Sequence, residues 1–72
     1  MTSEYIVIGS GEEVWCNYIE RYVTETEAMS KAEAAWEQIT ANDMSDCASI
    51  KVAIVNGNFI EKIIKVFSAE VA

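Results

Sequence analysis

The sequence predicts an α+β protein in the order ββαββ, a two-layer sandwich in which one helix covers one face of a four-stranded antiparallel sheet. Three observations lead to this fold class. An alanine-rich segment with helical periodicity occupies residues 24–40, apolar segments rich in β-branched residues lie on both sides of it, and Asn56-Gly57 separates the last two such segments as a hairpin turn would. With 72 residues the chain forms a single domain, residues 1–72, whose strand order stays open.

The first hairpin is predicted ahead of the helix. Glu4–Ile8 is a β-branched and aromatic segment, and we interpret the Gly9-Ser10-Gly11 that follows it as the hairpin connection. In Val14–Val23 apolar residues recur at near-helical spacing, yet seven of its ten residues are β-branched, aromatic or Cys, which are poor helix formers. We therefore predict a strand over Val14–Val23, with a helix as the alternative.

The helix is the clearest element and is predicted over Thr24–Thr40. Thr24 with Glu27 three residues later is a capping-box pattern, and acidic residues in the first turn complement the helix dipole. One side of the helix is apolar and consists of Ala28, Met29, Ala32, Ala35, Trp36 and Ile39. The small alanines let the helix lie close to a sheet, and we expect Trp36 to supply most of the buried area near its end.

The second hairpin is predicted after Ala41–Ala48, a connector rich in the Asn, Asp and Ser that are typical of turns. Ser49–Val55 is the outgoing strand, in which Ile50, Val52 and Ile54 alternate with Lys51 and Ala53. Asn58–Phe67 is the returning strand, with Ile60, Ile64 and Val66 expected on one face. Ser68–Ala72 is predicted to be a frayed tail.

A single helix can cover only one face of this sheet, so the second face is expected to be exposed. That face is predicted to show Tyr5, Val7, Phe59, Ile63 and Phe67, or their alternates along the strands. A contiguous apolar patch of this kind marks an interface, which indicates a homodimer or a docked partner. The residues we expect at such an apolar interface are Tyr5, Trp15, Phe59 and Phe67, although Trp15 suits the core equally well.

The charge of the chain is strongly and unevenly acidic, with a net charge of −7. Residues 1–46 hold ten acidic residues against Arg21 and Lys31, or −8, and residues 47–72 hold two against three lysines, or +1. An acidic surface repels nucleic acid and attracts basic protein surfaces. The residues we expect to bind such a partner are Glu12, Glu13, Glu20, Glu25, Glu33 and Glu37. The same charges could instead serve solubility alone.

Little in the sequence points to catalysis, a metal site or a cofactor. The chain has no His, and its two isolated cysteines, Cys16 and Cys47, are better read as small buried thiols than as a disulfide. The Gly9-Ser10-Gly11 sequence lacks the third glycine of a dinucleotide fingerprint, and the acids of the connector lack calcium-loop spacing. Without a visible signal peptide or a membrane-length apolar run, we expect a protein of the bacterial cytoplasm.

Three local patterns carry a resemblance to a known group of proteins. They are a T-x-x-E-A helix start at Thr24–Ala28, an A-x-x-x-W helix end at Ala32–Trp36 and a T-x-x-D turn at Thr40–Asp43. With these, residues 24–67 resemble small acidic proteins of bacteriophages and mobile elements of Gram-positive bacteria. The resemblance implies an inhibitor of a host nuclease or defence complex, of the anti-CRISPR or anti-restriction kind, that imitates nucleic acid. It implies no active site, because the shared patterns are structural.

Overall fold

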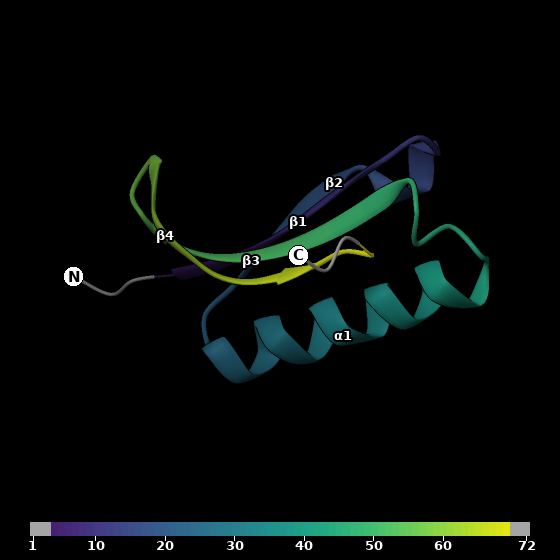
Figure 1. The fold of residues 1–72 in the computed structure, drawn as a ribbon. Helices are drawn as coiled ribbons and strands as arrows, with labels where there is room; N and C mark the ends of the chain where they lie inside the picture. Colours follow the sequence, from purple (N-terminus) through teal and green to yellow (C-terminus); the bar gives the residue numbers. More distant parts are fainter. Residues whose placement is uncertain (1–3, 70–72) are drawn as a thin grey trace.

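The computed structural model describes residues 4–69 and confirms the predicted α+β fold class, a four-stranded antiparallel sheet with one helix. Figure 1 shows the helix on one side of the sheet and no described segment on the other. In chain order the elements are β1 (Glu4–Gly11), the short 3-10 helix η1 (Val14–Cys16), β2 (Tyr18–Tyr22), α1 (Glu25–Ala41), β3 (Ala48–Asn56) and β4 (Phe59–Phe67). The end of the predicted tail, residues 70–72, lies outside the described part of the chain.

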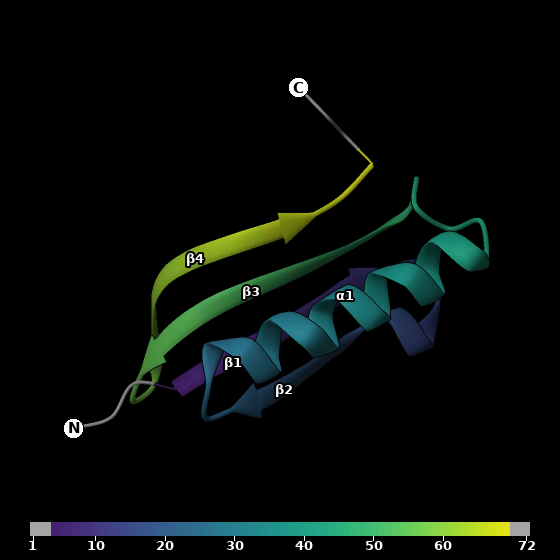
Figure 2. The ribbon, with the colours of Figure 1, turned by 90° about the horizontal axis from the view of Figure 1, so that it is seen from below.

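The strand order, which the sequence leaves open, is β2-β1-β3-β4. The two central strands are therefore β1 and β3, which pair antiparallel from Glu4 opposite Val55 to Gly11 opposite Ala48. The second strand of each hairpin, β2 or β4, therefore lies at an edge of the sheet. The helix contacts β3, β1 and β2, whereas β4 extends beyond its footprint, as Figure 2 shows.

The helix begins where its cap pattern predicts. Thr24 is the N-cap, and its hydroxyl oxygen accepts a hydrogen bond of 3.2 Å from the backbone N–H of Glu27. At the other end, Asn42 caps the helix, and Asp43 takes a left-handed conformation with φ of 61°. Such a conformation ends a helix, and Asp is one of the few side chains that tolerate it.

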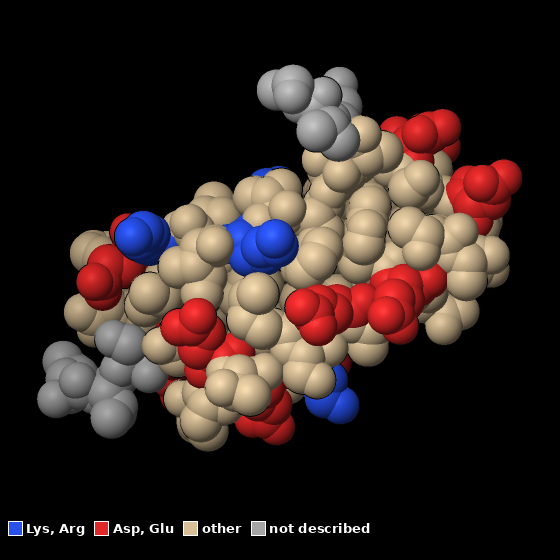
Figure 3. All heavy atoms as spheres, turned by 60° about the horizontal axis from the view of Figure 1, so that its bottom comes forward, with Lys and Arg blue, Asp and Glu red and all other residues tan. Residues whose placement is uncertain are grey.

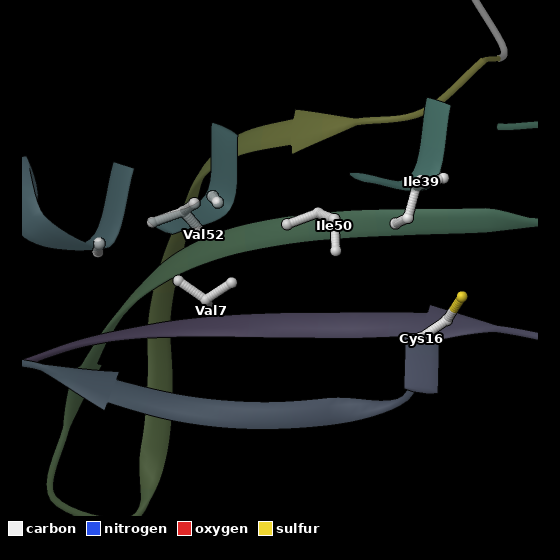
Figure 4. Close-up of a cluster of buried hydrophobic side chains, with 7 residues drawn as sticks. Val7, Cys16, Ile39, Ile50 and Val52 are labelled. Atoms are coloured by element: carbon white, nitrogen blue, oxygen red, sulfur yellow. The ribbon is translucent and has the colours of Figure 1, made fainter. Parts of the chain in front are cut away.

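A hydrophobic core fills the space between α1 and the sheet. The apolar side of the helix is confirmed, because Ala28, Ala32 and Ile39 are fully or almost fully buried. The alanines leave room for the sheet to approach. Figure 4 shows the cluster, in which side chains from α1, β1, β3 and η1 converge: Val7, Cys16, Ala28, Ala32, Ile39, Ile50 and Val52. Trp36 lies at its margin, with its ring centroid 6.3 Å from that of Phe67.

The first hairpin differs from its prediction in two ways. Gly9–Gly11 continue β1 instead of turning, and the predicted strand over Val14–Val23 is correct only for Tyr18–Tyr22. The connection is η1, held by Asn17, whose side-chain amide donates to Gly11 O at 2.7 Å and to Glu13 O at 3.0 Å. The glycines serve close packing instead: a Cβ on Gly9 would lie 2.4 Å from Cys16 O and 2.5 Å from Cε1 of Tyr18.

The second hairpin is confirmed, with its turn shifted by one residue. Asn56 pairs with Phe59, so the two turn residues are Gly57 and Asn58. Gly57 has a φ of +66° and open space around its missing Cβ. Glycine is favoured at the first turn position of a tight hairpin because this backbone conformation strains other residues.

The returning strand β4 is irregular, which corrects a prediction about its faces. Its register against β3 shifts twice, between Val52 and Ala53 and again between Ile54 and Val55. The predicted grouping of Ile60, Ile64 and Val66 on one face is wrong for Ile64, which packs against the helix-side core. Each shift inserts an extra residue into β4 and resets the alternation of its side chains.

Candidate interaction surfaces

The face of the sheet that points away from α1 is aliphatic, and we call it the open sheet face. Cross-strand partners lie on the same face of a sheet, so the register defines its members. Ala53 lies between Ile6 on β1 and Ile63 on β4, outside the helix-side core. The aliphatic members of the open sheet face are Ile6, Ile8, Ile19, Ala53, Val55, Ile60, Ile63 and Val66.

Much of this aliphatic surface is exposed to water. The exposed fractions are 67% for Ile19, 49% for Ile60, 46% for Ile63 and 49% for Val66. In the middle of the face, Ile6, Ala53 and Val55 form a small buried cluster, which is covered by neighbouring side chains of the sheet and not by the helix. The exposed residues lie along the two edge strands β2 and β4, on either side of this buried middle. Exposed apolar surface gathered on one face is typical of a binding site.

The open sheet face carries few charges. Glu4 forms a salt bridge of 2.7 Å to Arg21, the cross-strand partner of Ile6, at one edge. Lys51 lies between Ile8 and Val66 in the register, and Ser10 with Ser49 is the next cross-strand pair on the same face. The face is therefore aliphatic at its centre, with a net charge of +1 from these three charged residues.

The four residues predicted for an apolar interface lie elsewhere. Tyr5 and Phe67 are on the helix side and pack against the core, as does Val7, so their predicted place on the second face is wrong. The alternative prediction is correct for β1 and the end of β4, because Ile6, Ile8 and Val66 occupy that face in their place. Phe59 is exposed near the turn, opposite Asn56 and so on the helix side by alternation, and Trp15 is 46% exposed in η1. Of the predicted second face, Ile63 is correctly placed.

The acidic residues are exposed and almost entirely unpaired. Between residues 4 and 69, Glu4 forms the single salt bridge, and every other acidic side chain is exposed. Figure 3 shows the helix-bearing side of the molecule, where acidic side chains lie in several separate groups and some basic side chains lie among them. The six predicted binding residues do not form one cluster.

One acidic group forms at the end of the molecule where β1 leads into η1. The backbone N–H of Glu12 donates to Cys47 O at 3.2 Å, which joins this turn to the connector ahead of β3. Glu12, Glu13 and Asp46 are close enough to Cys47 that, together with its partial burial as the first cause, they raise the pKa of its thiol. We call these three residues the end group. The sequence places Asp46 far from the other two.

A second acidic group lies along α1. Glu33 and Glu37 are one turn apart on the flank that also holds Trp36, which faces Phe67 of β4. Glu25 and Glu27 are in the first turn, where the helix dipole favours acidic residues. Because η1 and the start of α1 are at opposite ends of the molecule (Figure 1), Glu25 is remote from the end group.

Glu20 has a distinct role on β2. It accepts a hydrogen bond of 2.5 Å from the hydroxyl of Tyr22, and this bond is the main reason that the pKa of Tyr22 rises to about 12. Glu27 of α1 contributes a smaller electrostatic effect on the same pKa. Glu20 is thus tied to the edge between β2 and α1, apart from both acidic groups.

Other kinds of site have little support in the described residues. Cys16 and Cys47 are free thiols; the prediction of a buried thiol is confirmed for Cys16, whereas Cys47 is only half-buried. Residues 4–69 contain no group of three or more His, Cys, Asp or Glu side chains arranged to hold a metal ion. An open depression of about 540 Å³ is lined by Ser45, Asp46, Ala48, Ser68 and Ala69.

The fold and its surfaces define a small α+β protein with acidic groups on its helix-bearing side and end, and aliphatic residues on the opposite side. No family model, curated protein or solved structure matches the chain. Among residues 4–69 there is also no helix with the length and apolarity that a membrane span requires.

Proposed function

We propose that this protein is a non-catalytic binding protein that docks its acidic side against a basic protein surface. The observation that carries the proposal is that its carboxylates are exposed and, apart from Glu4, make no salt bridge among residues 4–69. Unpaired charges on a surface create a strong field, which steers a partner of opposite charge. Glu33 and Glu37 on α1 form the centre of this surface, and the end group extends it.

The partner of this proposal is the nucleic-acid-binding groove of a host nuclease or defence complex in the bacterial cytoplasm. Glu33 and Glu37 are four residues, or about one helical turn, apart, which is about 6 Å along the axis. Nucleic-acid phosphates on one strand repeat about every 3.4 Å along the duplex axis, so a pair of carboxylates covers a comparable length of basic groove. The protein would thereby exclude nucleic acid without binding nucleic acid itself.

The experiment is displacement of labelled duplex DNA from two probes, a guide-loaded Cas9-type nuclease and a restriction endonuclease. We expect the protein to displace the DNA from at least one of them, without cleavage and without added cofactor. Affinity should fall at least about tenfold between about 50 and 200 mM salt, because screening weakens contacts between exposed charges. Binding that does not change with salt would contradict docking through the carboxylates.

A second candidate function is a structural or adaptor module that acts through the open sheet face. The observation that favours it is the exposure of Ile19, Ile60, Ile63 and Val66, each between 46% and 67%, on one face. In such a module the carboxylates would keep the protein soluble, while the aliphatic residues would form the contact. Binding through this face would not weaken with salt, because burial of apolar surface is the driving force.

A further inference from the structure

We propose that the open sheet face binds the same face of a second copy of this chain. The result is a symmetric dimer in four layers, with one helix on each outside and the two sheets stacked in the middle. The inference rests on the second candidate function, since it names the partner of that surface. It does not depend on the acidic side binding a basic protein.

The two register shifts in β4 are the first observation in its favour. In a regular strand, side chains three residues apart point to opposite faces. The shifts instead place Ile60, Ile63 and Val66 opposite Val55, Ala53 and Lys51, all on the open sheet face. Lys62 and Lys65 of β4 lie opposite Ile54 and Val52 on the helix side, where Lys65 is 5.2 Å from the centre of the Phe67 ring. The irregularities thus keep this face aliphatic.

The size of the face is the second observation. Three strands of eight or nine residues and the five-residue β2, spaced about 4.8 Å apart, cover roughly 500 Å² in projection. Two such faces together bury on the order of 1,000 Å² or more, which reaches the lower bound for a specific interface. An interface of this size must be well packed, and stacked sheets with interdigitating aliphatic side chains provide such packing.

Charge is the third observation, and it is compatible with a second copy as the occupant. Two chains of −7 repel each other unless their acidic parts stay apart. Stacking through the open sheet face places the two α1 helices about 30 Å apart, because three spacings of about 10 Å each separate them: helix to sheet, sheet to sheet, and sheet to helix. This exceeds the screening length of about 8 Å at physiological salt. Lys51 can extend its flexible stem toward the polar rim at Ser10 and Ser49.

Edge-to-edge pairing is the competing way to join two copies, and the edges disfavour it. A bulged edge strand is a poor template for a further strand. The shifts in β4 interrupt its outer edge, and β2 at the other edge is only five residues long. The exposed aliphatic surface would also stay in water after edge pairing, whereas face stacking removes it.

The experiment is sedimentation equilibrium of the full chain at micromolar concentrations, in low and in high salt. The expected mass is twice the 8.0 kDa of one chain, at both salt concentrations. Ile63→Lys places a charge on this face, on β4 opposite the buried Ala53, and should reduce the mass to that of one chain. Phe59→Lys is the matched control on the same strand but the helix side, and it should remain a dimer.

Each other outcome overturns the inference. A wild-type protein that sediments as one chain at these concentrations rules out the dimer, and equal effects of the two substitutions place its interface elsewhere. If Ile63→Lys fails to fold, Ile19→Lys on the 67% exposed edge position provides the same test. Loss of the dimer leaves the DNA-displacement result unchanged, so the two proposals fail separately.

Discussion

At the scale of single residues, Gly9 allows the segment 16–18 to pack closely against β1 in the first hairpin. The Tyr18 ring and the Cys16 carbonyl lie where a Cβ on Gly9 would be, within 2.5 Å. Gly57 is glycine for a different reason, since its surroundings are empty and its φ of +66° is the constraint. Substitution of the two glycines therefore compares the free-energy cost of overpacking with the cost of backbone strain.

We expect Gly9→Ala to lower the free energy of unfolding by about 2–3 kcal/mol, because overpacking forces backbone atoms to move. Gly57→Ala should cost only about 1 kcal/mol, the usual strain of a left-handed conformation. Urea unfolding of both variants gives the comparison. Equal losses would mean that the close approach at Gly9 is not a constraint.

Tyr22 provides a second test at this scale. With a pKa of about 12 instead of 10, its phenol should stay protonated through pH 11, since the bond to Glu20 requires the proton. The stability that this bond supplies is complete below pH 10 and is lost between pH 10 and about 12.

Titration of tyrosinate absorbance, with Tyr22→Phe to identify the residue, measures this pKa. Glu20→Ala, which removes the hydrogen-bond acceptor, should return it most of the way toward 10, whereas Glu27→Ala should change it little, because Glu27 acts only through charge and is the weakest cause. Equal shifts from both variants would show that the hydrogen bond is not the main cause.

At the scale of elements, α1 is the part that the sequence predicts best. Its start depends on Thr24, Glu27 and the spacing of alanines, which are all local features. Thr24→Ala should lower the free energy of unfolding by about 1 kcal/mol, while Thr24→Asp should cost much less, since its carboxylate can accept the same hydrogen bond. Thermal unfolding followed by circular dichroism measures both, and equal losses would contradict capping through the Glu27 N–H.

The strands were less predictable, because their limits depend on contacts between distant residues. Gly9 looks like a turn residue until Tyr18 and Cys16 are placed beside it. The 3-10 helix η1 depends on the hydrogen bonds of Asn17, which no periodicity reveals. Likewise, the shifts in β4 follow from pairing with β3, although the three-residue spacing of Ile60, Ile63 and Val66 was a visible sign of irregularity.

At the scale of the whole molecule, the sequence predicted that an exposed apolar face exists but not which residues form it. Residues 5–8 of β1 are all apolar, so alternation cannot tell the covered face from the open one. Tyr5 and Val7 pack against the helix-side core, so Ile6 and Ile8 lie on the open sheet face. The end group could not be predicted from the sequence either, because the backbone hydrogen bond between Glu12 and Cys47 is what brings Asp46 close to Glu12 and Glu13.

The proposed function predicts that the carboxylates of α1 act as a binding surface and not only as a means of solubility. The most direct measurement is the affinity of charge-reversed variants for the nuclease from which the wild type displaces DNA. Reversing Glu33 and Glu37 to Lys should weaken the affinity at least about tenfold. A single exposed charge pair contributes little to binding, but several pairs that act together contribute more. Glu61→Lys, an exposed reversal on β4, should change it less than about twofold. Unchanged affinity of the Glu33→Lys, Glu37→Lys protein would contradict the account.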